Sequence, residues 1–205
     1  MASILLVCTG NICRSPMAEG YLRTILAHRF GHRAPSVASA GTIARESAPV
    51  LEATAHAASE LGVDVSAHRA RRLRRGDVEA ADVVLGMASE HRDAVLELCA
   101  SASARAFTLK ELVCLLERLP PAPGFVEDPR EVLRVRVAEA DRLRRNGYEP
   151  LESGDVADPM GLGLEAFRAV AAEIDVWCSR LVDGLFGAPE AAEVVGRGTG
   201  RRAGA

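Results

Sequence analysis

Short apolar runs alternate with segments of helical periodicity through the first 119 residues. The apolar runs predict four buried strands, at residues 3–7, 36–40, 82–87 and 105–109. Between and after them, apolar side chains recur every three or four positions, which predicts helices at 16–30, 50–61, 89–99 and 110–119. Strands that alternate with helices favour an α/β fold, here a four-stranded parallel sheet covered by helices on both faces in three layers.

The pattern changes at residue 120. The sequence P-P-A-P-G at 120–124 opens a polar segment that runs to about 155 and holds one arginine-rich helical stretch, 129–145. We interpret this segment as an inserted helical piece packed on the surface or partly mobile. A last apolar stripe predicts a helix over 164–185, and the Ala-, Gly-, Glu- and Arg-rich end predicts a disordered tail. The organisation we expect is one domain over 1–187, with an insertion at about 120–155, and a tail over 188–205.

Composition narrows the class of protein. The chain has 205 residues, a formal net charge of −3 and a pI near 6.0, which argues against a general nucleic-acid binder. The arginine-rich run at 69–75 has no interleaved aromatic residue, so we interpret it as a solvated face that could attract anionic substrates. No apolar run is long enough to span a bilayer, and the five cysteines lack disulfide-rich spacing. We expect a soluble cytoplasmic protein with mostly free thiols and no membrane insertion.

The residues after the first strand carry candidate chemistry: C-T-G-N-I-C-R-S-P, from Cys8 to Pro16. A strand, a turn and a helix start bring backbone N–H groups together around an anion, and those donors favour a thiolate at Cys8. Arg14 offers a planar fork that can hold two phosphate oxygens. Ser15 suits the helix N-cap, Pro16 suits the first helical position, and the Ser15 hydroxyl can donate to the sulfur. These parts suit attack by sulfur on a phosphoryl group.

A second pair with the same spacing, Cys99 and Arg105, lacks a glycine, follows a helical stripe and leads into a strand. We give it no catalytic role.

The stretch from Cys8 to Pro16 resembles the phosphate loop of the low-molecular-weight protein tyrosine phosphatases. The sequences S-A-G-T at 39–42, S-A-H-R-A-R at 66–71, A-D-V-V-L-G-M at 81–87 and Asp158-Pro159 follow in that family's order, so the resemblance covers about 1–119 and 156–187. It implies that Cys8 is the nucleophile, Arg14 the phosphate clamp and Asp158 the general acid, with no metal or cofactor. It further implies loop support by Asn11, Ser39 and His68, and a reversible disulfide between Cys13 and oxidised Cys8. The phosphate-binding residues it implies are Thr9, Gly10, Asn11, Ile12, Cys13, Arg14 and Ser15.

Two Asp-Pro pairs compete for the role of general acid, because a phosphomonoester needs a proton on its leaving oxygen. Asp158 precedes a glycine-bearing loop, 160–163, and the last helix, which suits a mobile acid on a rigid scaffold. Asp128 is interpreted as an ordinary turn or helix start. We therefore predict Asp158 as the acid.

The substrate is less narrowly defined. Where many relatives carry aromatic residues around the pocket, this chain has Met160, Gly161 and Arg45. Ile12 favours phosphotyrosine, whereas M-A-E at 17–19 and F-T-L-K-E at 107–111 resemble the phosphoarginine-directed branch, which has threonine at the place of Ile12. We predict a protein-tyrosine-phosphatase acting on phosphorylated proteins or peptides, with a possible partner contact through 120–155. The alternatives are a protein-arginine-phosphatase, a thioredoxin-coupled arsenate reductase and a phosphate-binding module without turnover.

Overall fold

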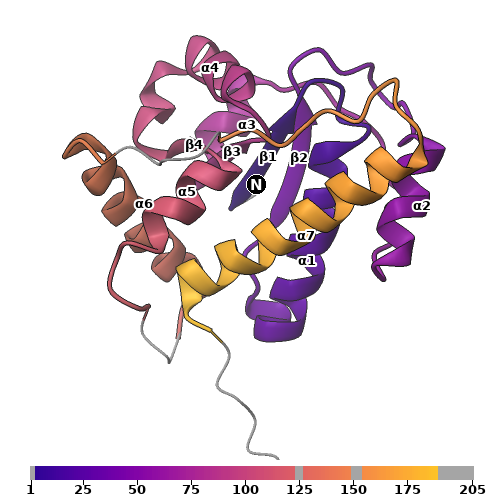
Figure 1. Ribbon diagram of the computed structural model, residues 1–205. Coiled ribbons are helices and arrows are strands. Elements are labelled where there is room, and N and C mark those ends of the chain that lie inside the picture. Colours follow the sequence, from indigo (N-terminus) through magenta and orange to yellow (C-terminus); the bar gives the residue numbers. More distant parts are fainter. Residues whose placement is uncertain (1–2, 123–126, 149–153, 189–205) are drawn as a thin grey trace, which may run out of the picture.

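The computed structural model describes residues 3–122, 127–148 and 154–188, and its centre is a parallel sheet (Figure 1). The four strands lie in the order β2-β1-β3-β4. They are β1 (Ile4–Cys8), β2 (Val37–Gly41), β3 (Val83–Gly86) and β4 (Ala106–Thr108). Cys8 lies opposite Gly41, and Val7 lies opposite Gly86, so the carboxyl ends of the three neighbouring strands meet at one edge. Loops at this edge of a parallel sheet are the usual place for a binding site.

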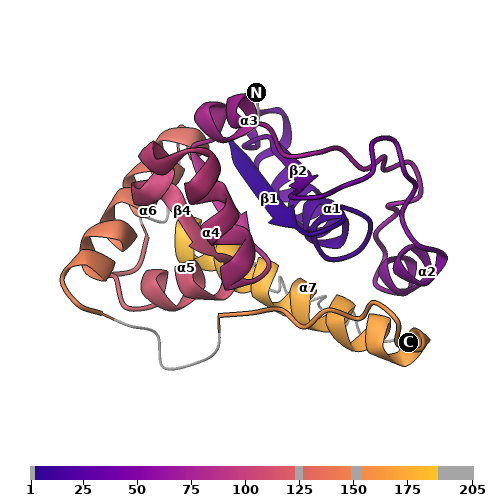
Figure 2. The same cartoon turned by 90° about the horizontal axis from the view of Figure 1, so that it is seen from above.

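Helices cover both faces of the sheet, as Figures 1 and 2 show. Ile4 and Leu6 of β1 belong to a buried cluster with side chains of helices on one face, while Leu5 and Val7 belong to a second cluster on the other face. The first face carries α1 (Arg14–Phe30), α2 (Glu52–Glu60), α5 (Leu109–Leu116) and α7 (Leu164–Phe186). The second face carries α3 (Arg75–Ala80), α4 (Ser89–Leu98) and the 3-10 helix η2 (Ala100–Arg105). The predicted three-layer α/β fold is confirmed.

Three short elements were not predicted: α3, η2 and the 3-10 helix η1 (Gly31–Arg33). In α3 the single buried side chain is Val78, in η2 it is Ala102, and η1 buries none. A helix with one buried position or none has no apolar repeat, so the pattern of the sequence gave no signal for it.

The inserted segment does contain the predicted helix, α6 (Pro129–Arg145). Asp128 is its N-cap, and its carboxylate accepts hydrogen bonds from the N–H groups of Arg130 (2.9 Å) and Glu131 (3.3 Å). Of the two expected arrangements, packed on the surface or partly mobile, the structure shows the packed one. Leu133, Val137 and Ala140 are buried in the main cluster, because they form an apolar stripe at helical spacing that the surrounding arginines obscure.

Other expectations about the chain ends stay predictions. The tail at 188–205 lies, apart from residue 188, outside the described residues, and the domain boundary at 187 is therefore a prediction. Within the described ranges, none of the helices combines the length and apolar character that crossing a bilayer requires.

Candidate active site

The loop at residues 9–13 joins β1 directly to α1. Cys8 is the last residue of β1, and α1 begins at Arg14, two residues earlier than expected. Cys13 is the N-cap and makes no side-chain capping bond. The Ser15 hydroxyl does not cap the helix, because it contacts the sulfur of Cys8 instead. Pro16 fits the first turn, since N–H groups there lack intrahelical partners and proline has no N–H to lose. The first-turn N–H groups are thus left for an anion.

Two groups hold the sulfur of Cys8. Its Sγ lies 3.0 Å from Ser15 Oγ and accepts from the N–H of Asn11 at 3.3 Å. Asn11 Nδ2 donates to Ser15 Oγ at 3.0 Å, so the Ser15 hydroxyl proton remains for the sulfur. Both contacts bring a hydrogen-bonding group to the nucleophilic sulfur.

Asn11 is the centre of the loop's support. It is fully buried and adopts φ of 54°, a left-handed conformation that asparagine tolerates better than most residues. Its side chain donates to Ser39 Oγ at 2.8 Å and accepts from the N–H of Arg71 at 2.9 Å. Its carbonyl accepts from His68 Nε2 at 3.1 Å. The structure thus places Ser39 and His68 against Asn11.

Glu19 completes this support and was not predicted. Ser39 Oγ donates to Glu19 Oε2 at 2.5 Å, and His68 Nδ1 lies 3.7 Å from the same oxygen. Burial lowers the pKa of His68, and the carboxylate of Glu19 opposes that shift. Glu19 lies one helical turn beyond Ser15 on α1, a spacing that could have indicated a shared face.

Arg14 connects the loop with the segment that precedes α7. Its guanidinium is almost fully buried and donates to the carbonyl of Val156 (3.2 Å), to Thr9 Oγ1 (3.3 Å) and to Asp158 Oδ2 (2.6 Å). The Asp158 carboxylate is 42% exposed and accepts from the N–H of Met160 at 3.1 Å. The structure therefore brings Asp158 to the loop, while Asp128 caps α6.

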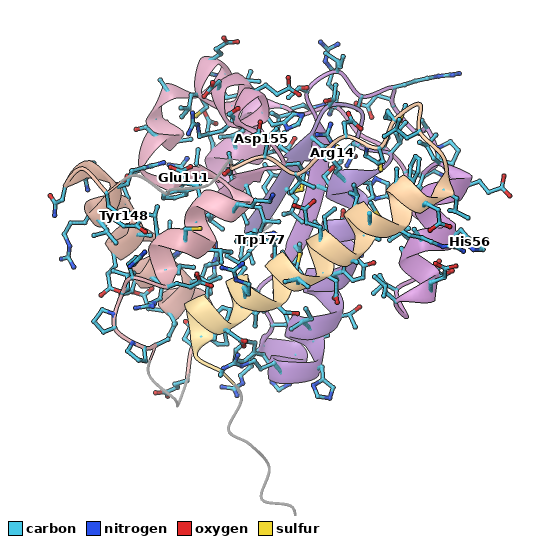
Figure 3. All side chains as sticks on the ribbon, in the orientation of Figure 1. Arg14, His56, Glu111, Tyr148, Asp155 and Trp177 are labelled. Atoms are coloured by element: carbon cyan, nitrogen blue, oxygen red, sulfur yellow. The ribbon has the colours of Figure 1, made fainter. Side chains whose placement is uncertain are left out.

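The segment with Asp158 is fixed to the carboxyl edge of the sheet. The N–H of Val156 donates to the carbonyl of Met87 at 2.7 Å, and Asp155 accepts from the N–H of Ser89, the first residue of α4, at 2.7 Å. In Figure 3 the connection into α7 passes from the labelled Asp155 across the top of the sheet to the region of Arg14. Two anchors just before Asp158 thus set its position.

A cavity of about 190 Å³ opens above the loop. Its lining combines the chemically active groups with three apolar side chains: Cys8, Thr9, Gly10, Ile12, Cys13, Arg14, Ile43, Asp158 and Met160. Asn11 and Ser15, two of the predicted phosphate-binding residues, are fully buried and do not appear in this lining. Ile43 was not predicted; its side chain is 71% exposed, and its N–H donates to the carbonyl of Thr9 at 3.1 Å.

Cys13 and Cys99, the two other cysteines considered in the sequence, lie in different surroundings. Cys13 lines the cavity with Cys8, and burial raises its pKa from an ordinary 9.0 to about 12. The disulfide between Cys8 and Cys13 stays a prediction. Cys99 is buried on the other face of the sheet, and Arg105 donates to the carbonyls of Ser101 and Val78, so this pair is structural.

Comparison with known proteins adds to the geometry. The family model for low molecular weight phosphotyrosine protein phosphatase matches residues 3–132. A protein-arginine-phosphatase of Geobacillus stearothermophilus is 32% identical and aligns with 89% of this chain and 95% of its own. A probable low molecular weight protein-tyrosine-phosphatase, EpsP, of Ralstonia solanacearum is 36% identical over 54% of this chain and 72% of its own.

The solved structures that this chain resembles come from the same family as these relatives. A low molecular weight protein tyrosine phosphatase from T. tengcongensis superposes with a TM-score of 0.65 at 30% identity, covering 89% of this chain and 99% of that one. The YwlE arginine phosphatase of Geobacillus stearothermophilus gives 0.65 at 28% identity, over 89% and 91%. The family match covers more than half of this chain and includes the loop that holds Cys8 and Arg14. The chain therefore belongs to the low-molecular-weight protein tyrosine phosphatase family, and it is a phosphatase.

Proposed function

We propose that the protein hydrolyses phosphorylated proteins through a cysteinyl-phosphate on Cys8, without a metal, and that phosphotyrosine is its preferred substrate. The observation that carries the reaction type is the shared cavity: the sulfur of Cys8, held by Ser15 and Asn11, lines it together with Arg14 and Asp158. Nucleophile, positive clamp and carboxyl group thus face one space.

In the proposed reaction, Cys8 Sγ attacks phosphorus as the bond to the leaving oxygen breaks. Protonated Asp158 gives its proton to that oxygen and becomes a carboxylate. The carboxylate then takes a proton from water, the resulting oxygen nucleophile displaces sulfur from phosphorus, and inorganic phosphate leaves with Cys8 again a thiolate. Arg14 and the first-turn N–H groups of α1 neutralise the phosphoryl oxygens throughout.

Substrate binding must rearrange one contact. Arg14 Nη2 lies 2.6 Å from Asp158, so an incoming phosphate competes with that carboxylate for the guanidinium. Displacement leaves Asp158 beside the cavity, where it can reach the leaving oxygen. The ion pair with Arg14 thus holds Asp158 close to its site of action.

The cavity wall supports phosphotyrosine. Ile12, Ile43 and Met160 present apolar surface around the loop, and among the described residues Asp158 is the one carboxylate in the lining. A phenyl ring gains from burial against such a wall, whereas the polar guanidino group of phosphoarginine would need hydrogen-bond acceptors there.

Protein-arginine-phosphatase activity is the second candidate. It is favoured by the Geobacillus relative, which aligns with nearly its whole length. Arsenate reduction is less favoured, because a thiol relay needs several cysteines near the site. Among the described residues Cys13 is the one other cysteine in the cavity lining, while Cys99 lies on the opposite face of the sheet and Cys178 is buried in α7.

The test compares peptides that differ in the phosphorylated residue alone. Phosphate release is measured in EDTA from matched phosphotyrosine and phosphoarginine peptides, with wild type, Cys8→Ser and Ile12→Thr. We expect release by wild type, none by Cys8→Ser, and a shift of preference towards phosphoarginine in Ile12→Thr. Equal rates for wild type and Cys8→Ser would overturn the cysteine mechanism, and a wild-type preference for phosphoarginine would overturn the substrate assignment.

The proposal also includes a place of action and a partner. A thiolate nucleophile functions in a reducing compartment, which supports a cytoplasmic location. A partner contact through 120–155 stays a prediction, and Val135 is an apolar side chain of α6 that is left exposed.

A further inference from the structure

His91 is a buried histidine in contact with the phosphate loop, although it lies far from that loop in the sequence. It belongs to α4, is 1% exposed, and places Nε2 2.9 Å from Thr9 Oγ1. Thr9 lines the cavity, and its hydroxyl also accepts a hydrogen bond from Arg14 at 3.3 Å. A continuous chain of contacts therefore runs from α4 through Thr9 to the phosphate clamp.

The surroundings of His91 indicate which nitrogen carries the proton. Burial, with the positive charge of Arg14, lowers the pKa of His91, although Glu90, Asp155 and Asp158 oppose the shift. A neutral imidazole has one N–H group. Nε2 also lies 3.3 Å from Glu90 Oε1, and a carboxylate accepts hydrogen bonds without donating them. The two contacts of Nε2 favour the tautomer with its N–H on Nε2, in which His91 donates to Thr9.

This assignment determines what the Thr9 hydroxyl can do. A hydroxyl has two acceptor positions and one proton. Arg14 and His91 occupy the two acceptor positions, so the proton of Thr9 is left for a third group in the cavity. With the proton on Nδ1 instead, Thr9 would donate to His91 and would have none to offer.

The other ring nitrogen points to a role beyond packing. His91 Nδ1 is buried and makes no hydrogen bond within the described part of the chain. A buried polar atom without a partner is costly, so packing alone does not favour a histidine at this position. An apolar side chain of similar size would fill the same space without that cost.

We propose that His91 is a positioning residue of the phosphate loop: its Nε2–H orients the Thr9 hydroxyl, so that Thr9 holds Arg14 and donates its own proton to a phosphate oxygen. The inference rests on the proposed cysteine-phosphatase function, since it concerns the same loop. To the proposed phosphate-binding groups it adds the Thr9 hydroxyl as a hydrogen-bond donor, and it names His91 as the residue that makes this donor available.

The test uses His91→Leu, His91→Gln, Thr9→Val and the double variant Thr9→Val/His91→Leu, with para-nitrophenyl phosphate as substrate. His56→Leu is the matched control, because this histidine lies on α2 with its side chain 53% exposed. Inorganic phosphate serves as a competitive inhibitor that reports binding to the loop, and thermal unfolding reports stability.

We expect His91→Leu and Thr9→Val each to lower kcat/KM about tenfold, as loss of a hydrogen bond to a charged group does. The inhibition constant of phosphate should weaken in parallel. His91→Gln should retain most activity, because the glutamine amide keeps an N–H donor near the position of Nε2. The double variant should lose no more than either single variant, since both act through one hydroxyl.

The proposal is overturned if His91→Leu keeps wild-type phosphate affinity, if glutamine restores nothing, or if the losses multiply in the double variant. Should His91→Leu fail to fold, a loss in Thr9→Val with retention in His91→Gln still supports it, and the reverse overturns it. Failure of the proposed function would look different, because Cys8→Ser would then release phosphate as fast as wild type.

Discussion

Asp158 and Asp128 share the sequence Asp-Pro but lie in different surroundings. Asp158 contacts Arg14 at the mouth of the cavity, whereas Asp128 caps α6 with two backbone hydrogen bonds. Asparagine can also cap a helix, but it cannot donate the proton of a carboxylic acid.

This difference leads to a paired prediction. Asp158→Asn should lower kcat for a phosphotyrosine peptide by roughly 10²- to 10⁴-fold, the usual contribution of a general acid. The loss should be smaller for para-nitrophenyl phosphate, whose leaving group needs less protonation. Asp128→Asn is the matched control and should retain wild-type turnover. Steady-state kinetics on both substrates measure the effect, and an active Asp158→Asn beside an inactive Asp128→Asn would reverse the assignment.

Two buried thiols and a buried phenol lead to a second prediction, which concerns stability at high pH. Burial raises the pKa of Cys13 from 9.0 to about 12, and it raises the pKa of Cys178 and of Tyr21 as well. Above about pH 9 the unfolded chain releases these protons while the folded chain keeps them, so the free energy of unfolding should fall as pH rises. Each group contributes a slope of at most about 1.4 kcal/mol per pH unit.

Urea unfolding in reducing buffer, at about pH 8 and about pH 10, measures this slope. Cys178→Ala removes one of the groups, so its stability should depend less steeply on pH than that of wild type. An unchanged slope in this variant would show that the buried thiol does not contribute.

Besides its buried apolar face, the helix of the inserted segment has one arginine that contacts the edge of the sheet. Arg144 of α6 lies with its guanidinium carbon 4.0 Å from the centre of the Phe107 ring, and it donates to the carbonyls of Ala106 (3.0 Å) and Ser103 (2.6 Å). It also contacts Glu111 and Asp141. Figure 3 labels Glu111 near the start of α5. These contacts attach α6 next to β4.

Arg144→Gln should therefore lower the free energy of unfolding by about 2–3 kcal/mol, through loss of charge-assisted hydrogen bonds and of the ring contact. Arg142→Gln on the same helix removes the same charge from an exposed position and should change stability by less than about 0.5 kcal/mol. Chemical unfolding of both variants makes the comparison. Equal stabilities would show that Arg144 does not hold the helix.

The sequence predicts some of these elements better than others, for physical reasons. The four strands are apolar runs bounded by polar turns, so each could be identified alone. The start of α1 could not, because whether Ser15 caps the helix depends on the sulfur of Cys8 across the loop. The buried stripe of α6 was hidden by the arginines around it.

The residues of the candidate site likewise divide into those that the sequence predicts and those that it does not. Cys8 and Arg14 were identifiable because a short motif holds both. Glu19 offered only its helical spacing from Ser15 as a signal. Ile43 and His91 offered none, since their contacts with the loop exist only after distant segments fold together.

Several arginines lie on segments that contact the phosphate loop, although the chain as a whole carries a net charge of −3. Arg72 pairs with Gly41, the last residue of β2, and Arg69 pairs with Pro49 in the segment that follows β2. The N–H of Arg71 donates to Asn11 of the loop. Arg72 and Arg45 are exposed near this junction. Such a charge distribution attracts anionic substrates.

We predict that kcat/KM for an acidic phosphotyrosine peptide falls several-fold between about 0.05 and 0.5 M salt, because salt screens long-range attraction. Arg45→Gln/Arg72→Gln should reduce both kcat/KM and its salt dependence for this peptide, with little effect on para-nitrophenyl phosphate. Arg142→Gln controls for loss of an arginine elsewhere. A salt dependence that is identical in wild type and the double variant would contradict the prediction.

The central claim is that phosphate passes through the sulfur of Cys8, and rapid-quench mass spectrometry tests it most directly. Wild-type protein is mixed with a phosphotyrosine peptide in EDTA, quenched in acid within the first turnover and digested. The account predicts one added phosphoryl group on the peptide that contains Cys8, formed before phosphate is released and absent from Cys8→Ser. Phosphate release at the wild-type rate with no phosphoryl group on Cys8 at any time would contradict it.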